Sequence, residues 1–507
     1  MATPDYIVEA AKDGNSTLYI LREGKKIPLH STVSPAGEAG LLKNFFDPGR
    51  YDKLVVLGIG LGYHLSPLSG NLDRYSAVIL IDILKGIEKN ITSNPETGFL
   101  TRNRKVTFVT GLDAESAAEK AVSLLSIDSA SGISIIEHPS SNRLFQEYYG
   151  KIKKIVTRHI NTAAGNLATK KQFGMRYIRN IVSNISTFDS AMMVSDLKNI
   201  FKGMPVLVVS SGPSIGNHIE SIRKYQRKLI IIAVDSAMPI LQSHEIQPDV
   251  VVSIDPQPYT MEHLMGINMN ESIFVYSLSS CNAGLGKARR FLSLNTHPFS
   301  QLVDHITGGA IGSIDSGTGT VAGDSLALAL HTGASMVGLL GFDFSFPWFT
   351  IYSRGTAYQN RYSLFYQTRI TPVESQNASY IMKSSGGHRT EGAFTRKSFI
   401  GYRDRLSELV KRNGIRNVFS INTAGLPIEN VPVITFDRFI REHCGRILEK
   451  SPDLTGLTRV RDIFNPSDFT GALYDKNLLN TIIGEAFGSV DETIKNKIIA
   501  LIAHSLK

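Results

Sequence analysis

The sequence predicts an α/β protein built from two Rossmann-like, doubly wound units and a C-terminal helical domain. Short apolar runs alternate with helix-length segments in the first region, and the same alternation returns in the centre of the chain. Beyond the centre, apolar residues recur at helical spacing. Because 507 residues exceed what one hydrophobic core serves, we divide the chain into an N-terminal domain (1–160), a helical connector (161–200), a central domain (201–430) and a C-terminal helical domain (431–507).

The first region contains short apolar runs that predict a parallel sheet. Each run is continuous rather than alternating, which is typical of strands covered on both faces. The runs are 54–57, 77–81, 106–109 and 133–136.

Glycines follow the first of these runs, at Gly58, Gly60 and Gly62. Glycines between a strand and a helix let a nucleotide approach the backbone closely. Asp82, about twenty residues further on, is placed to reach ribose hydroxyls, and Asp113 ends the next strand in position to meet an adenine edge. Together these residues resemble a class I methyltransferase core. The alternative is a structural Rossmann-like domain whose glycines only allow tight packing.

The central region repeats the strand–helix alternation. We expect strands at 205–209, 229–234, 249–254 and 335–341, and helices at 215–226, 236–243 and 320–332. Ligands of open α/β sheets bind at the carboxyl ends of the strands, so the loops that follow these strands are candidates for a site.

A small, hydroxyl-rich loop follows the first central strand, where Ser211, Gly212, Pro213 and Ser214 open directly into a predicted helix. A helix N-terminus carries free N–H groups and a positive dipole end, both of which favour an anion. Gly212 lacks the Cβ that would block approach, and Pro213 stiffens the turn. We therefore expect phosphate binding here. The alternative is that Ser214 only caps the helix.

A second loop of this kind, Ser316, Gly317 and Thr318, precedes a later helix. Two such loops predict a ligand that is held from two sides. Neither loop is followed by Gly-Lys-Ser/Thr, so neither is a Walker A phosphate loop, and ordinary ATP hydrolysis is not indicated.

Acidic side chains end three of the central strands, at Asp235, Asp255 and Asp343. Because the carboxyl ends of parallel strands share one edge of a sheet, these side chains are expected to converge. They can bind ribose hydroxyls, orient an acceptor or hold a metal ion. The sequence contains no Asp-x-Asp pair, so a glycosyltransferase metal site of that kind is not indicated, and we expect no metal.

An aromatic stretch follows Asp343, and Tyr352 and Tyr358 belong to it or lie just beyond it. Such a segment can form a mobile lid with tyrosine hydroxyls that face a leaving phosphate, or it can be core packing. His388 lies in a polar, glycine-containing loop, so it is a candidate general base; a surface histidine without a role is the alternative.

Composition and charge limit the binding partners and the cellular location that we expect. The formal net charge is +9 and the pI about 9.2, but no Lys/Arg block interleaved with aromatic residues indicates nucleic-acid binding. No apolar run is long enough for a membrane span, and the first residues do not resemble a secretory signal. Two cysteines, Cys281 and Cys444, argue against a disulfide framework or a cysteine-ligated metal and suit a reducing cytoplasm.

Several of these motifs in combination resemble the motility-associated factor (Maf) glycosyltransferases. That family's central domain is shared with the archaeal 6-hydroxymethylpterin diphosphokinases (MptE-like) and is similar to the sialyltransferase fold. The central motifs are 206–214, 231–236, 248–256, 341–343 and 422–428. Leu29-His30-Ser31, Pro35 and Glu38-Ala39, followed by the glycine cluster, resemble the family's N-terminal domain.

The resemblance implies a protein O-glycosyltransferase. It would move a nonulosonic acid of the pseudaminic, legionaminic or sialic type from a CMP-activated donor to Ser or Thr of flagellin. The first loop, with Asp235, and the second loop would bind the nucleotide, while Tyr352 and Tyr358 steady the leaving phosphate. Asp255, Asp343 and His388 would act around sugar and acceptor. No cofactor beyond the donor is implied.

Three alternatives stay open at this point. A 6-hydroxymethyl-7,8-dihydropterin diphosphokinase would transfer from ATP with magnesium, held by the aspartates at the strand ends. An S-adenosylmethionine-dependent methyltransferase would use the N-terminal glycines. A non-catalytic flagellin-binding protein would need neither.

Overall fold

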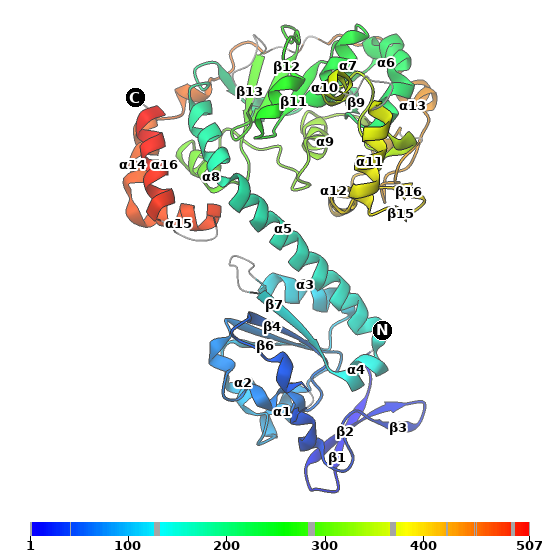
Figure 1. Ribbon diagram of the computed structural model, residues 1–507, viewed down its shortest axis with the longest axis vertical. Helices are drawn as coiled ribbons and strands as arrows, with labels where there is room; N and C mark the ends of the chain where they lie inside the picture. The colour runs from blue at the N-terminus through cyan, green and yellow to red at the C-terminus, as the bar shows by residue number, and fades with distance from the viewer. Residues whose placement is uncertain are drawn as a thin grey trace. The chain divides into compact units, whose positions relative to one another are not determined.

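The computed structural model describes residues 3–40, 42–125, 132–281, 289–365, 372–421, 424–450, 452, 454–487 and 492–505 (Figure 1). Asn422 and Thr423 of the expected motif 422–428 lie outside these residues. The chain divides into two compact units, Met1–Gln172 and Phe173–Ala486, and the second also takes in Val490–Lys507. The long helix α5 (Gln146–Ile185) contributes residues to both units.

In the described part of the first unit, a parallel sheet has the order β6-β5-β4-β7. Its strands are β4 (Tyr51–Leu57), β5 (Ala77–Asp82), β6 (Val106–Thr110) and β7 (Gly132–Glu137). Alternate residues enter opposite hydrophobic clusters, with Val55 and Ile79 on one face and Leu54 and Val78 on the other. Both faces are therefore covered, as the continuous apolar runs predicted.

Short helices and an antiparallel sheet complete this unit. The helices are α1 (Glu88–Ser93), α2 (Phe99–Arg102), α3 (Ala114–Leu124) and α4 (Pro139–Leu144). The antiparallel sheet consists of β1 (Tyr6–Ala10), β2 (Ser16–Arg22) and β3 (Lys25–Pro28).

Asp82 closes the glycine loop that follows β4. Its Oδ2 accepts the N–H groups of Ile59 at 2.6 Å and Gly60 at 2.9 Å, and its Oδ1 accepts the N–H of Leu84 at 2.9 Å. The side chain is only 1% exposed, and this burial raises the pKa of the carboxyl despite the hydrogen bonds. Asp82 thus holds the loop from inside the protein.

In the described part of the second unit, an all-parallel sheet has the order β17-β14-β9-β10-β11-β12-β13-β8. The strands are β8 (Ala191–Met193), β9 (Pro205–Val209), β10 (Ile230–Val234), β11 (Val250–Ser253), β12 (Ile273–Ser277), β13 (Arg289–Ser293), β14 (Met336–Leu340) and β17 (Val418–Ser420). Strands β9, β10, β11 and β14 confirm the sequence expectation, whereas β8, β12, β13 and β17 were not predicted.

The strand order reverses at β9. From β9 the chain adds β10, β11, β12 and β13 in one direction, and then returns to place β14 on the other side of β9. Such a switch point opens a crevice between the loops that leave the two central strands, and ligands of open α/β sheets bind there. The loops after β9 and β14 therefore mark the expected ligand position.

Helices cover the sheet and extend the unit. Helix α9 (Val321–His331) packs against β9, β10 and β11. The others before the C-terminal region are α6 (Ile219–Tyr225), α7 (Met238–Ser243), α8 (Pro298–Ile306), α10 (Ala357–Phe365), α11 (Val373–Ser385), α12 (Lys397–Arg412) and α13 (Phe436–His443). A short hairpin, β15 (Arg389–Thr390) and β16 (Ala393–Phe394), lies between α11 and α12.

The C-terminal region is helical, as predicted, with α14 (Pro466–Tyr474), α15 (Lys476–Phe487) and α16 (Glu492–Ser505). Helix α14 contacts α8 within the second unit. Among the described helices, none combines the length and apolarity that a bilayer crossing requires.

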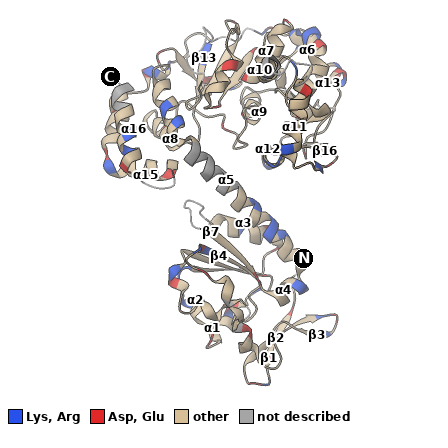
Figure 2. Ribbon diagram, in the orientation of Figure 1, with Lys and Arg blue, Asp and Glu red and all other residues tan. Residues whose placement is uncertain are grey.

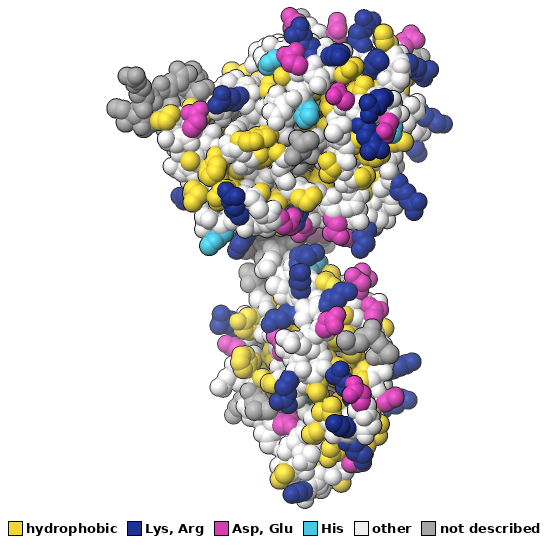
Figure 3. All heavy atoms as spheres, turned by 90° about the vertical axis from the view of Figure 1, so that its right-hand side faces the viewer, with side chains coloured by type: hydrophobic (Ala, Val, Ile, Leu, Met, Phe, Trp, Pro, Cys, Tyr) yellow, Lys and Arg dark blue, Asp and Glu magenta, His cyan; other side chains and the backbone are white. Residues whose placement is uncertain are grey.

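Basic and acidic side chains are spread over both units. Figure 2 shows Lys and Arg on many helices of each unit, with Asp and Glu among them. On the face drawn in Figure 3, charged and hydrophobic side chains are likewise interspersed. The excess of 54 Lys and Arg over 45 Asp and Glu is therefore distributed rather than collected on one element.

We predict that Asp82→Asn destabilises the first unit, because one acceptor oxygen becomes an N–H donor that faces backbone donors. The expected cost is about 3 kcal/mol in the opening free energy of the β4 and β5 amides. Native-state hydrogen exchange measures it, with Glu115→Gln on the exposed face of α3 as the control. Equal exchange in both variants would contradict the structural role of Asp82.

Candidate functional site

The loops that leave β9 and β14 are joined directly at the switch point. The N–H of Ser210 donates to the carbonyl of Leu340 at 2.8 Å, and that of Gly212 donates to the carbonyl of Gly341 at 3.2 Å. One turn further, the N–H of Ser214 donates to Oδ2 of Asp343 at 2.9 Å. The loop of Ser211–Ser214 and the acid after β14 are thus parts of one structure.

Glycines allow this close approach. A Cβ on Gly212 would lie 2.3 Å from the carbonyl oxygen of Gly341 and 2.5 Å from Oδ2 of Asp343. A Cβ on Gly341 would meet the carbonyl of Ser210 at 2.3 Å, and one on Gly425 the carbonyl of Asp343 at 2.4 Å. Gly212 was expected to lack a side chain so that a ligand could approach, but contacts within the chain already require a glycine there.

The helix start does not confirm Ser214 as N-cap. A short 3₁₀ helix, Pro213–His218, begins directly after Gly212, which is the N-cap residue. Ser214 lies inside the first turn, fully buried, and its amide is taken by Asp343. The capping alternative was wrong because the turn starts two residues earlier than the hydroxyl pattern suggested.

Asp343 is a buried carboxyl, 2% exposed, and burial raises its pKa to about 6. Its Oδ2 has the Ser214 amide, whereas its Oδ1 is buried without a hydrogen-bond partner among the described residues. A buried oxygen of this kind is unusual and requires an explanation, such as a water molecule, an ion or a ligand group.

Asp235, directly after β10, is held by neighbouring groups on both oxygens. Ser253 Oγ donates to Oδ2 at 2.6 Å, and the Ser236 amide donates to Oδ1 at 2.7 Å. Oδ1 also lies 3.4 Å from Nδ1 of His263. Ser236 Oγ in turn donates to Ser211 Oγ at 2.9 Å, which links this group to the first loop.

Asp255, after β11, lies in the same region. Burial raises its pKa to about 6, and the negative charge of Asp235 adds to the rise. Tyr259 is close enough that, after burial, the charge of Asp255 helps to raise its pKa to about 12, while the charge of Arg176 acts in the opposite direction. Arg176 comes from the last part of α5.

The second loop is fixed by an acid that the sequence argument did not identify. Asp324, in the first turn of α9, accepts the amide of Ser316 at 2.9 Å and its hydroxyl at 2.6 Å. Burial raises the pKa of Asp324 to about 7. Arg405 Nε donates to the Thr318 carbonyl at 2.8 Å. Gly317 is exposed with a φ of +69°. Its amide donates to Asp315 Oδ1 at 2.9 Å, but a Cβ there would meet nothing within 4 Å, so the space beside it is open.

Tyr352 and Tyr358 lie beside each other, whereas His388 lies apart from this cluster. The rings of Tyr352 and Tyr358 lie 4.7 Å apart, and both pack against a small core around Phe346. His388 is exposed in the turn after α11. Within the described residues, the structure gives its ring no contact with Asp255 or Asp343.

Sequence reasoning missed His263, Asp324, Arg176 and Arg405 in this region. His263 ends the short helix η9 (Pro258–His263), eight positions after Asp255 in the printed sequence. A histidine so soon after a strand-end acid was the one available signal for it. Arg176 and Arg405 lie on the helices α5 and α12, far in sequence from the strand ends. No local sequence pattern predicts that they reach this edge of the sheet.

The candidate residues of the N-terminal unit have partners within the chain. Asp82 accepts loop amides, as described above, and Asp113 is the N-cap of α3, where it accepts the amides of Glu115 and Ser116. Gly58 and Gly60 have positive φ, and a Cβ on either would strike Ser141 or His30. Gly62 also has a positive φ, of +83°. These residues serve the packing of the loop in the structure.

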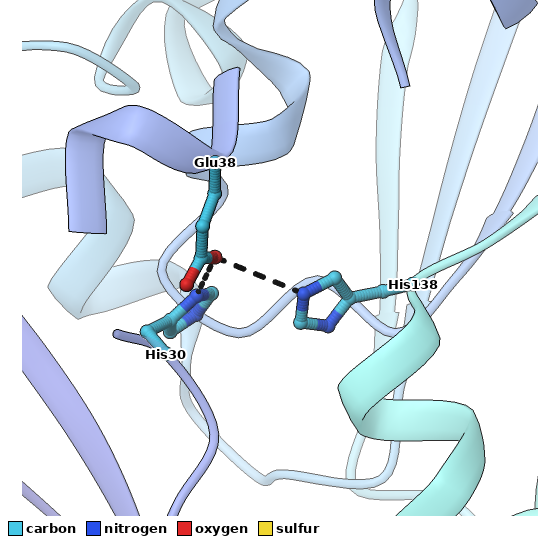
Figure 4. Close-up of side chains that lie close together, drawn as sticks. All are labelled: His30, Glu38 and His138. Carbon is cyan, nitrogen blue, oxygen red and sulfur yellow. Dashed lines mark hydrogen bonds and ion pairs between the residues drawn. The ribbon is translucent and has the colours of Figure 1, made fainter. Parts of the chain in front are cut away.

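Beside this loop lies a group of His30, Glu38 and His138, drawn in Figure 4, whose ligand atoms lie within 4.8 Å of one another. His30 Nδ1 is 2.6 Å from Glu38 Oε2, and the Leu61 amide donates to His30 Nε2 at 2.8 Å. The single lone pair of a neutral His30 is therefore on Nε2, and Nδ1 carries the proton that Glu38 accepts. That polarity fits a hydrogen-bond chain that fixes the glycine loop, and it does not fit metal ligation by His30.

The central domain matches a known protein family. Residues 179–348 match the family model described as "6-hydroxymethylpterin diphosphokinase MptE-like". The matched range contains β9, β10, β11 and β14, and with them the switch point. The chain therefore contains an MptE-like domain.

The whole chain is similar in fold to the solved structure of the MAf glycosyltransferase from Magnetospirillum magneticum AMB-1. The TM-score is 0.60 at 14% sequence identity, and the match covers 100% of this chain and 87% of that one. An α/β architecture with parallel sheets and C-terminal helices is thus shared along the full length.

Two relatives from Treponema pallidum (strain Nichols), both described as uncharacterized proteins, are similar in sequence. One is 27% identical over 107 residues, which is 21% of this chain and 50% of the relative. The other is 24% identical over 232 residues, or 44% of this chain and 75% of the relative. The first match spans half of that relative's length.

We predict that Gly212→Ala destabilises the second unit by about 2 kcal/mol, because backbone and a buried carboxyl occupy the space of the new methyl group. The loss of unfolding free energy is measured by hydrogen exchange of the β9 and β14 amides over a denaturant series. Gly401→Ala inside α12 is the control, since its nearest atom is Arg405 Nη1 at 3.6 Å. An unfolding free energy that is unchanged in Gly212→Ala would show that the switch point is looser than described.

Proposed function

We propose that this protein is a glycosyltransferase whose reaction takes place at the carboxyl edge of the eight-stranded sheet in the described part of the second unit. The observation that carries the proposal is the switch point, where a hydroxyl-rich loop and buried carboxyls meet at the position that this fold type uses for ligands. The likeness in fold to a MAf glycosyltransferase supports the same assignment.

The donor in this proposal is a CMP-activated nonulosonic acid, and the acceptor is a Ser or Thr hydroxyl of flagellin. CMP leaves with a single phosphate, so its charge can be met by hydroxyls and arginines without a metal. Most loop amides are already bonded within the chain, for example Ser214 to Asp343 and Gly317 to Asp315. The hydroxyl of Ser316 is likewise engaged by Asp324, whereas Ser211 Oγ accepts from Ser236 Oγ and keeps its own proton. We therefore assign phosphate contact to the Ser211 hydroxyl and to the open space at Gly317. A donor of this type places the reaction in the cytoplasm.

The remaining candidate residues take supporting roles in this proposal. Tyr352 and Tyr358 steady the leaving phosphate, and Asp255 and Asp343 act near sugar and acceptor. Asp343 suits this assignment because its Oδ1 has no described partner and its pKa is raised to about 6. His388 is dropped as the base, because it is exposed and makes no described contact with these groups.

A diphosphokinase reaction is the second candidate, favoured by the family description of residues 179–348. It requires ATP and magnesium, which prefers carboxylate oxygens that converge at close range. Among the described residues, the group that meets such a spacing is His30, Glu38 and His138, in the other unit. The strand-end acids are instead engaged separately, Asp235 by Ser253 and Asp343 by Ser214.

We predict that the protein binds CMP in calorimetry and that Gly317→Ala weakens this binding at least tenfold. The methyl group would project into open space on the ligand side, so the fold needs little adjustment beyond local backbone strain. Gly309→Ala is the matched control, since Gly309 is also exposed, has a φ of +76° and has nothing within 4 Å of a Cβ position.

Two results would contradict this proposal. If CMP fails to bind while ATP with magnesium binds, the diphosphokinase reading replaces it. If both glycine variants bind CMP as the wild type does, the nucleotide lies elsewhere.

A further inference from the structure

His263 is held against a fixed carboxylate at the edge of the central sheet. It ends η9, and its side chain is 14% exposed. Its Nδ1 is buried, makes no short hydrogen bond among the described residues, and lies 3.4 Å from Asp235 Oδ1, which is an ion-pair distance.

Asp235 cannot turn away from this contact without losing its other bonds. Ser253 Oγ and the Ser236 amide fix its two oxygens, and the residue is 2% exposed. A carboxylate that is fixed in this way orients an imidazole and selects the tautomer with the proton on Nδ1. Nε2, which has no hydrogen bond among the described residues, then carries the lone pair.

The charges around His263 come from several elements. Asp235 follows β10, Asp255 follows β11, and Glu262 is the neighbour on η9. Arg361 of α10 pairs with Glu262 at 3.5 Å, and Arg176 of α5 acts on the nearby Tyr259. Burial alone would lower the pKa of His263, but the negative charges outweigh it and raise the pKa above its usual value.

We propose that His263 is the general base of this site and that Asp235 is the residue that positions it. The inference rests on the proposed glycosyl transfer and names the proton acceptor of that reaction. His263 Nε2 takes the proton of the acceptor hydroxyl as its oxygen bonds to the anomeric carbon of the donor. The bond from that carbon to the phosphate oxygen breaks, and CMP leaves with the electron pair. The proton then passes from His263 to solvent.

This role suits His263 better than it suits His388, the histidine that the sequence favoured. His388 is exposed in a turn, and within the described residues no carboxylate orients its ring. His263 has both a fixed acid behind it and Asp255 nearby, where the chain after β11 reaches the ligand edge.

The kinetic test measures CMP release from CMP-pseudaminic or CMP-legionaminic acid with flagellin as acceptor, over a range of pH. His263→Gln should lower the rate about 10²–10⁴-fold while CMP affinity stays within twofold of the wild type. Asp235→Asn should lower the maximal rate. It should also shift the fall in rate on the acid side of the pH–rate profile to lower pH, because removal of the negative charge lowers the pKa of His263. His305→Gln, at an exposed position of α8, is the control.

If the pair of His263 and Asp235 had only a structural role, Asp235→Asn would not change the pH at which the rate falls on the acid side. An unchanged pH of this fall in Asp235→Asn, or a full rate in folded His263→Gln, overturns the inference and leaves glycosyl transfer itself intact. A wild type that neither binds CMP nor turns over either donor refutes the proposed function instead.

The orientation of His263 is tested independently of turnover. With ¹⁵N-labelled histidine, the signal that disappears in His263→Gln assigns this ring, and its titration is followed by NMR. The proposal predicts the tautomer with the proton on Nδ1 and a lower pKa in Asp235→Asn than in the wild type. The opposite tautomer, or an equal pKa in both proteins, would overturn the pairing.

Discussion

The contact between the Asp343 carboxylate and the Ser214 amide is the constraint on which the central site depends. It ties the loop after β9 to the loop after β14, and it forms only because Gly212 and Gly341 let two backbones meet without side chains. Gly425 supplies the third surface, against the Asp343 carbonyl. Ser211 of the first loop also accepts the Ser236 hydroxyl, which connects the joined loops to the residues around Asp235.

Buried carboxyls hold the loops at this edge of the sheet by hydrogen bonds. Asp343 fixes the first loop, Asp324 fixes the second, and Asp235 is fixed by hydroxyl and amide donors in front of His263. Burial raises the pKa of Asp343 to about 6 and that of Asp324 to about 7, so each is held at a cost in stability near neutral pH. Just beyond Asp343, Phe344, Trp348 and Phe349 have positive φ, a strained conformation that collects at functional sites.

The continuous apolar runs of β9, β10 and β11 were predicted correctly. The pattern is short or mixed in three of the missed strands: β8 and β17 have three residues each, and β13 begins with two arginines. Strand β12 is an equally continuous apolar run that the prediction overlooked. For the site, the sequence places Asp235, Asp255 and Asp343 after strands of the parallel sheet, and in the structure they follow β10, β11 and β14 at its carboxyl edge. A strand-end position does not show which way the side chain points. Asp82 was expected to bind a ribose, but its carboxylate points inward and accepts amides of the glycine loop. The pairing of His263 with Asp235 spans two separate loops, so no local spacing shows it.

Hydrogen exchange with mass spectrometry, with and without CMP, is the most direct test that the ligand lies at the joined loops. We predict that CMP slows exchange in residues 210–216 and 315–319 and leaves exchange in residues 57–63 unchanged. Protection confined to 57–63 would place the nucleotide on the glycine loop of the first unit, and would contradict the assignment of the switch point as the site.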